Sequence, residues 1–178
     1  MTNDDNPLPD LLERKICDAL RGIICPRESA PANRATLNAK LRDVLADLGG
    51  KLGYGVYPSS QRPGHASEWV YDIIWLEQSN GINGFLQDVP LVCESELGSK
   101  GEASDDFQRL LLCRARHRLM VYAVNKPDDL PVRRDDFIKE ITECKLSEFG
   151  DRYILAGWVW SQPLQGFDLF LYVVGVAG

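Results

Sequence analysis

Three acidic residues, Asp72, Glu94 and Glu96, stand in strongly apolar stretches of the sequence and are the best candidates for chemistry. Asp72 interrupts the run EWVYDIIWLE, and the other two close the run VPLVCESEL. Burying an ionised carboxylate is costly unless the carboxylate is paired or binds a metal. A divalent ion would also remove the repulsion among three acids, and Mg²⁺ prefers oxygen ligands. We therefore expect Asp72, Glu94 and Glu96 to bind Mg²⁺ or Mn²⁺.

A purely structural explanation of the same acids is also open. Strands at a protein surface often carry acids, so Glu94 and Glu96 would need no metal on the solvent face of an edge strand. An arginine from the following run RLLLCRARHR, residues 109–118, could equally neutralise one of the three carboxylates. The sequence pattern alone does not decide between the metal and the arginine.

Two predicted strands, residues 68–77 and 89–97, must position these acids. Both runs are rich in β-branched and aromatic or apolar residues, which favours strands. Side chains alternate between the faces of a strand, so Glu94 and Glu96 share one face. The Asn- and Gly-rich segment 79–84 predicts a turn between the strands. The two strands are therefore expected to pair as neighbours.

The remaining elements follow from the same kind of pattern. Apolar residues repeated every three to four positions predict helices, and short apolar runs predict strands. The predicted helices are 8–24, 36–49, 104–117 and 134–149, and the other predicted strands are 52–57, 119–124, 153–160 and 167–176. This order predicts a single α/β domain over residues 1–178, with a mixed central sheet flanked by helices.

Residues 36–124 resemble the core of the PD-(D/E)XK nuclease superfamily, which has the restriction-endonuclease-like fold. That core runs helix, three strands, helix, strand. Its signature is an acid on the second strand and (D/E)-x-K on the third. Asp72 matches the first acid, and Glu94-Ser95-Glu96 matches the second part with glutamate in place of lysine. The resemblance implies an αβββαβ core, extended by an N-terminal helix and by a C-terminal helix and strand pair.

The resemblance also implies an activity, which is metal-dependent hydrolysis of phosphodiester bonds in DNA or RNA. Asp72 and Glu94 would bind Mg²⁺ or Mn²⁺, and Glu96 would act as a further ligand or as the base. Some restriction endonucleases of the superfamily also carry glutamate at the lysine position. The same replacement fits an inactive relative that kept the fold and acts as a protein-interaction or dimerisation module. Both alternatives stay open at this point.

Three further residues are expected to contact nucleic acid. Some superfamily members carry Gln-x-x-x-Tyr on the helix after the third strand, and here Gln108 matches the glutamine while Leu112 replaces the tyrosine. Lys100 or Arg109 would supply the positive charge that the missing lysine otherwise provides. Arginine forks also match phosphate oxygens. His117, at the end of the same helix, is expected to be a helix-terminal residue rather than a base.

The composition limits which functions are possible. The chain carries 26 acidic and 20 basic residues, a formal net charge of -6, which argues against a protein that coats nucleic acid non-specifically. A local basic patch, such as residues 109–118, remains compatible with that balance. The five cysteines show no C-x-x-C spacing. They indicate reduced thiols rather than a disulfide framework or a zinc site.

The ends of the chain bear on location and assembly. Residues 1–10 are polar and acidic, unlike a signal peptide, and the apolar run 169–178 is too short to span a bilayer. We therefore expect a cytoplasmic protein with no membrane partner. In the alternative to a nuclease, the last two predicted strands form a homodimer interface. Its predicted interface residues are Trp158, Trp160, Phe167, Phe170 and Tyr172.

Overall fold

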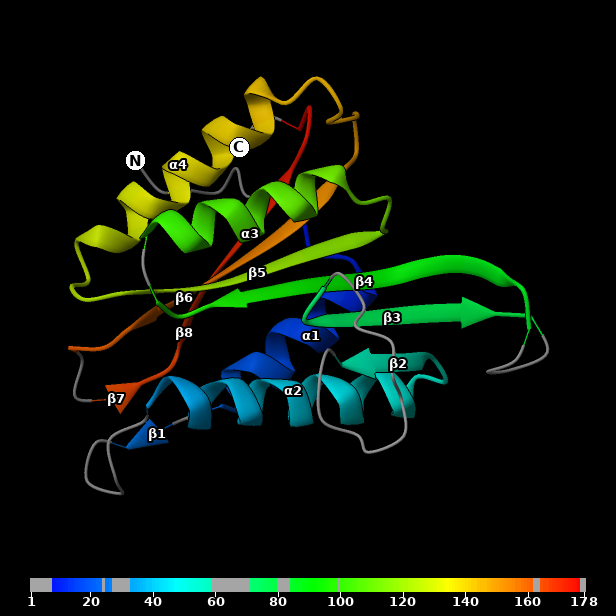
Figure 1. Ribbon diagram of the computed structural model, residues 1–178, viewed down its shortest axis with the longest axis horizontal. Helices are drawn as coiled ribbons and strands as arrows, with labels where there is room; N and C mark the ends of the chain where they lie inside the picture. Colours follow the sequence, from blue (N-terminus) through cyan, green and yellow to red (C-terminus); the bar gives the residue numbers. More distant parts are fainter. Residues whose placement is uncertain are drawn as a thin grey trace.

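The fold is an open, mixed β-sheet with helices on both faces (Figure 1). The computed structural model describes residues 8–23, 25–26, 33–58, 71–79, 84–98, 100–161 and 164–176. The polar sequence of residues 58–66 predicts a turn or loop. That segment and the first residues of the predicted strand 68–77 lie largely outside the described residues. The predicted α/β class with a mixed central sheet is confirmed.

The helices are α1 (Leu11–Arg21), α2 (Arg34–Lys51), α3 (Lys100–Leu112) and α4 (Asp129–Glu143). The six strands of the main sheet are β2 (Gly55–Pro58), β3 (Ile73–Gln78), β4 (Leu86–Glu96), β5 (His117–Val124), β6 (Arg152–Val159) and β8 (Phe167–Val173). Two short strands, β1 (Cys25–Pro26) and β7 (Leu164–Gln165), form a separate antiparallel pair. Pro26 and Pro31 in the sequence predict a loop over residues 25–35, and β1 departs from that prediction.

The strand order in the main sheet is β2-β3-β4-β5-β6-β8. β3 runs antiparallel to both of its neighbours, β2 and β4, and β4, β5 and β6 run parallel. β8 then pairs antiparallel with β6. Parallel neighbours need a long crossover, and α3 and α4 supply the two crossovers. The predicted pairing of the strands that carry the acids is confirmed, since Ile73 lies opposite Cys93.

The sheet separates two apolar cores. One core lies under α1 and α2 and receives Trp75 and Cys93 from the sheet. The other lies under α3 and α4 and receives Ile74 and Val92. These pairs come from adjacent positions of β3 and β4, as the alternation of side chains along a strand requires. Both faces of the central strands are therefore buried, and a polar residue there needs a partner.

The course of α2 differs from the prediction at both ends. Its N-cap is Asn33, whose side chain accepts a hydrogen bond from the Thr36 N–H, so Thr36 is not the cap. The helix also continues through Gly49-Gly50 to Lys51. A Cβ atom at Gly49 would lie 2.6 Å from Val56 Cγ2. Glycine is therefore present because α2 approaches the sheet closely there.

The prediction that a helix runs to His117 is wrong. α3 begins at Lys100 and ends at Leu112, and His117 opens strand β5, opposite Leu91 of β4. His117 is fully buried, and its ring nitrogens contact polar atoms far away in the sequence. α4 likewise begins at Asp129 and ends at Glu143, several residues before the predicted bounds. Within the described ranges, no helix has the length and apolar character needed to cross a membrane.

Candidate functional site

Asp72, Glu94 and Glu96 belong to the face of the sheet that α3 covers. Ile74 and Val92, each two positions from one of these acids, pack in the core under α3 and α4. By alternation, the three acids are directed to the same side. Asp72 itself lies just before the first residue of β3, not inside a strand as predicted.

Hydrogen bonds across the β3–β4 pair hold Asp72 and Glu94 together. The Asp72 backbone N–H donates to Glu94 Oε2 at 3.3 Å, and the Ser95 N–H donates to Asp72 Oδ2 at 2.9 Å. The Ser95 hydroxyl donates to Asn38 Oδ1 of α2 at 2.7 Å. The two carboxylates are thus fixed as neighbours, and α2 anchors the residue between Glu94 and Glu96.

Glu94 is the most deeply buried of the three acids, with 1 % of its side chain exposed. Burial raises the pKa of Glu94 to about 7, against a hydrogen bond from Arg109 that favours the ionised form. The negative charge of Asp72 raises this pKa further. Glu94 therefore changes its protonation near neutral pH and needs a cation beside it whenever it is ionised.

Arg109 of α3 is the cation that meets Glu94. Its Nε donates to Glu94 Oε1 at 2.8 Å, and its Nη2 donates to Asp106 Oδ1 at 2.6 Å. Burial raises the pKa of Asp106, Arg109 counteracts this, and the charge of Asp72 raises the pKa again. The Arg109 guanidinium therefore lies in a site that holds at least three carboxylates: Asp72, Glu94 and Asp106.

The sequence did not single out Asp106 as a site residue. The signal that could have found it is its spacing of three residues from Arg109, which places both side chains on one face of a helix. From the sequence alone, Asp106 is an acid that suits the first turn of the predicted helix 104–117.

Glu96 lies two residues beyond Glu94, at the end of β4. Its carboxylate accepts a hydrogen bond from the Gly98 N–H. Burial raises the pKa of Glu96, the bond from Gly98 opposes this, and the charges of Asp106 and Glu102 raise the pKa further. A Cβ at position 98 would contact the Glu96 carboxylate, which would have to shift to make room for it. Glu96 thus lies beside the same acidic site.

The donor set suits a magnesium or manganese ion, but the site is not a preassembled three-ligand centre. Among the residues that the structure describes, Asp72, Glu94 and Glu96 do not form a group whose ligand atoms all lie within 4.8 Å of one another. Mg²⁺ is commonly held by one or two carboxylates and keeps several waters. The hydrogen-bonded pair Asp72 and Glu94 meets that requirement.

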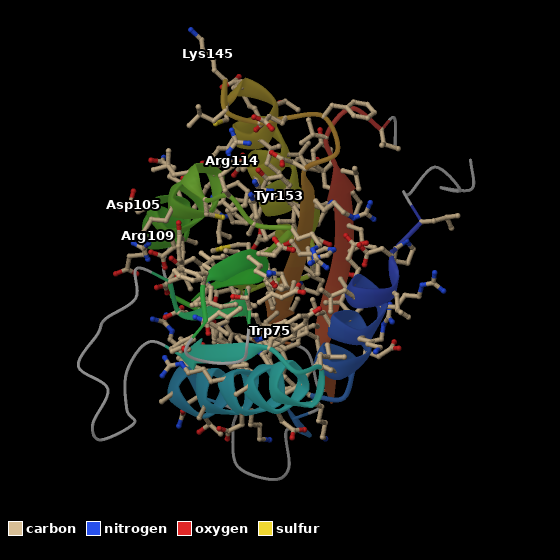
Figure 2. The ribbon with its side chains drawn as sticks, turned by 90° about the vertical axis from the view of Figure 1, so that its right-hand side faces the viewer. Trp75, Asp105, Arg109, Arg114, Lys145 and Tyr153 are labelled. Carbon is tan, nitrogen blue, oxygen red and sulfur yellow. The ribbon has the colours of Figure 1, made fainter. Side chains whose placement is uncertain are left out.

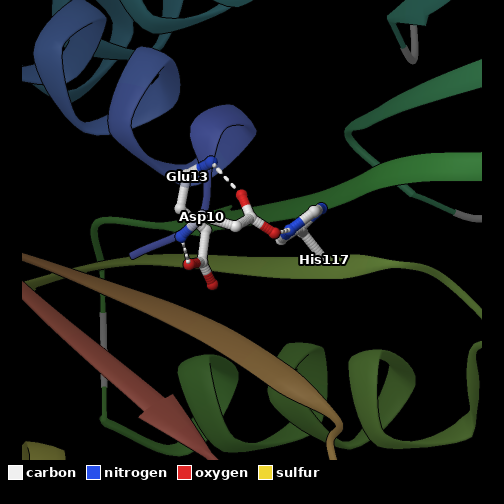
Figure 3. Close-up of side chains that lie close together, drawn as sticks. All are labelled: Asp10, Glu13 and His117. Atoms are coloured by element: carbon white, nitrogen blue, oxygen red, sulfur yellow. Dashed lines mark hydrogen bonds and ion pairs between the residues drawn. The ribbon is translucent and has the colours of Figure 1, made fainter. Parts of the chain in front are cut away.

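A different group, Asp10, Glu13 and His117, does bring three ligand atoms within 4.8 Å and could hold a metal ion (Figure 3). His117 Nε2 lies 2.7 Å from Asp10 Oδ2, and His117 Nδ1 lies 3.0 Å from the Pro90 carbonyl oxygen. Asp10 and Glu13 also cap the start of α1 reciprocally. The sequence missed this group because His117 and Asp10 are 107 positions apart.

Arg152 already neutralises this second group. Its Nε donates to Glu13 Oε1 at 2.8 Å and its Nη2 donates to Glu13 Oε2 at 2.6 Å, so both oxygens of the buried Glu13 are occupied. Burial opposes ionisation of Asp10, yet hydrogen bonds from the Glu13 N–H and from His117 lower its pKa. The group therefore works as a structural anchor that ties α1 to β5 and β6.

The structure separates the three residues that were expected to contact nucleic acid. Arg109 reaches the acidic site, and Gln108, the preceding residue of α3, is exposed. Lys100 instead pairs with Asp136 of α4 at 2.6 Å. It also lines a cavity of about 320 Å³ that extends to Arg133.

The basic run 109–118 is divided among separate ion pairs. Arg114 pairs with Glu148 and Arg116 pairs with Asp88, both away from the acidic site. Arg118 is buried, and its guanidinium lies over the Tyr153 ring. Of the four arginines in this run, Arg109 is the one that pairs with a candidate site acid.

Comparison of the chain with known protein families, with curated proteins and with solved structures found no match.

The raised pKa of Glu94 predicts an effect of Glu94→Gln on the metal-free protein. Between the ordinary value of 4.5 and about 7, folded Glu94 holds a proton that the unfolded chain has released. The stabilisation that this bound proton provides is therefore fully present below pH 4.5 and is lost as the pH rises through 7. We expect wild type to lose about 2 kcal/mol of unfolding free energy between pH 5 and pH 8, and Glu94→Gln to lack this loss.

Urea unfolding at both pH values, with a chelator present, measures this difference. Glu143→Gln is the matched control, because Glu143 is an exposed glutamate of α4. If the unfolding free energy changed by the same amount between the two pH values in wild type and in Glu94→Gln, the prediction would be wrong.

Proposed function

We propose that this protein is a metal-dependent nuclease that hydrolyses phosphodiester bonds of nucleic acid. The observation that carries the proposal is Glu94, a buried carboxylate bonded to the backbone of Asp72 and facing an arginine. Two adjoining acids on a sheet are a costly arrangement that a divalent ion stabilises. The element order α2-β2-β3-β4-α3-β5 supports the proposal, because it matches the order of the superfamily core.

Each residue of the site would have a separate role in the reaction. Asp72 and Glu94 would hold Mg²⁺ or Mn²⁺, and Glu96 would accept a proton from the attacking water or serve as a further ligand. A divalent ion bound here would polarise the phosphate and make its water more acidic. Ser95 would position Asp72 through its backbone N–H.

Nucleic acid would approach the site along α3. Since the net charge of the chain is -6, binding would depend on local donors rather than on overall charge. Arg109 and Gln108 would supply these donors next to the acids. Lys100 would contribute only after leaving Asp136.

The second candidate is a non-catalytic interaction module on the same fold. The replacement of lysine by Glu96 favours it, and so does the lack of a preassembled three-ligand group at this site in the described chain. The aromatic residues proposed for a dimer interface give it less support. Trp158 is fully buried, Trp160 and Phe167 pack on the core under α1 and α2, and Phe170 packs on the opposite core.

Thermal melts with Mn²⁺ test the metal site directly. A ligand that binds only the folded state stabilises it by about 2.7 kcal/mol at a hundredfold excess over its dissociation constant. We expect Mn²⁺ to raise the melting temperature of wild type, and Glu94→Gln to lose this increase. Glu143→Gln should respond like wild type, because its carboxylate lies on α4 away from the site.

A third variant separates the two acidic groups. His117→Gln removes the nitrogen ligand of the group near α1, and its melting temperature should still rise with Mn²⁺. An increase that persists in Glu94→Gln but disappears in His117→Gln would place the ion at Asp10 and Glu13. No increase in wild type would count against the proposed function.

A further inference from the structure

We propose that Arg109 is an exchangeable counter-ion, which neutralises Glu94 before a divalent ion binds and contacts the substrate phosphate afterwards. This inference rests on the proposed function and adds an order to it. The ion would bind first, and its arrival would create the phosphate contact.

The charge of the site supports the exchange. Glu94 is buried, and the Nε of Arg109 lies 2.8 Å from its Oε1. An unpaired charge at such a position is strongly destabilising, so the metal-free site needs this guanidinium. A divalent ion between Asp72 and Glu94 would supply the same positive charge and would repel Arg109. The guanidinium and the ion therefore compete for one carboxylate.

The position of Arg109 allows it to move. Figure 2 shows Arg109 on α3 toward the outside of the molecule, and 42 % of its side chain is exposed. Its second partner, Asp106, lies on the same helix, three residues earlier. Arg109 can therefore release Glu94 and keep Asp106 as an anchor at the edge of the site.

A released guanidinium suits a phosphodiester. Its planar set of N–H donors matches two phosphate oxygens, and water leaves it more readily than it leaves an ammonium group. Arg109 would then lie beside a phosphate bound to an ion that Asp72 and Glu94 would hold. Before the ion binds, the same donors face Glu94 and Asp106. Substrate binding would therefore depend on prior binding of the metal.

The test is the affinity of Arg109→Gln for Mn²⁺, measured by titration calorimetry without substrate. Titrations at several pH values give the affinity of the ionised form of Glu94, because losing the Arg109 hydrogen bond also raises the pKa of Glu94. Removing the competing cation should tighten Mn²⁺ binding about two- to fivefold, the range expected for an ion pair whose arginine is partly exposed. Cleavage of labelled DNA and RNA oligonucleotides at saturating Mn²⁺ should fall at least about tenfold, because the phosphate contact is lost. Arg114→Gln is the matched control, since Arg114 is exposed and pairs with Glu148.

The sign of the change in affinity decides the question. Weaker or unchanged Mn²⁺ binding by Arg109→Gln would overturn the exchange, because Arg109 would then orient Glu94 rather than compete for it. If Arg109→Gln does not fold, Arg109→Lys carries the test. It should bind Mn²⁺ within about twofold of wild type and still cleave more slowly, because lysine keeps the charge but lacks the fork. If Glu94→Gln bound Mn²⁺ as wild type does, the proposed function itself would be wrong.

Discussion

Asp72→Asn is expected to lower metal-dependent cleavage of nucleic acid at least about a thousandfold while the fold stays intact, a barrier increase of about 4 kcal/mol. Asparagine keeps the shape of the side chain and an oxygen that can accept the Ser95 N–H. It removes the negative charge from one of the two carboxylates proposed to hold the ion. The loss should therefore appear in activity and not in the folded structure.

Initial rates on labelled single- and double-stranded DNA and RNA, with Mg²⁺ or Mn²⁺, measure the effect, and circular dichroism checks the fold. Asp43→Asn is the matched control, because Asp43 is an exposed acid of α2. Cleavage that persists unchanged in Asp72→Asn would assign the activity to another site. A wild type that cleaves none of the four substrates would favour the interaction module.

Arg152→Met is expected to have the largest effect on stability, a loss of about 3–5 kcal/mol of unfolding free energy. Glu13 is fully buried, and Arg152 donates to both of its oxygens. Without the guanidinium, a buried carboxylate at the start of α1 would have no matching cation. The variant would also weaken the contact between α1 and β6.

Chemical denaturation measures this loss against Arg21→Met. Arg21 also forms an ion pair, with Asp18, but both side chains are mostly exposed, so its removal should cost less than about 1 kcal/mol. The double variant Glu13→Gln with Arg152→Met should recover part of the loss, because it no longer buries a charge. Equal effects of Arg152→Met and Arg21→Met would show that the buried pair does not stabilise the fold.

Local pattern was enough to predict most elements and the faces of the acids. The pairing of the strands around residues 79–84 follows from turn chemistry, and alternation along β4 places Glu94 and Glu96 on one side. These features depend on neighbours in the sequence. The sequence therefore predicted that Asp72 and Glu94 would lie close together, and their hydrogen bonds confirm that.

Contacts between distant segments decided the rest. His117 follows a helical run, yet it joins β5 because Leu91, Pro90 and Asp10 meet it there. The anchor of α1 on Glu13 and Arg152 likewise spans 139 positions. Helical periodicity contains no information about such partners, so the end of α3 and this second acidic group could not be predicted.

The choice of cation at the acidic site also depended partly on the sequence and partly on the tertiary structure. The sequence alone determined that buried acids here need positive charge, because burying an ionised carboxylate among apolar residues costs free energy in any fold. It left open whether a metal or an arginine supplies that charge. The tertiary structure decided that Arg109 of α3, and not Arg114 or Arg116, reaches Glu94. The packing of α3 across β4 determines that contact, and packing depends on the whole chain.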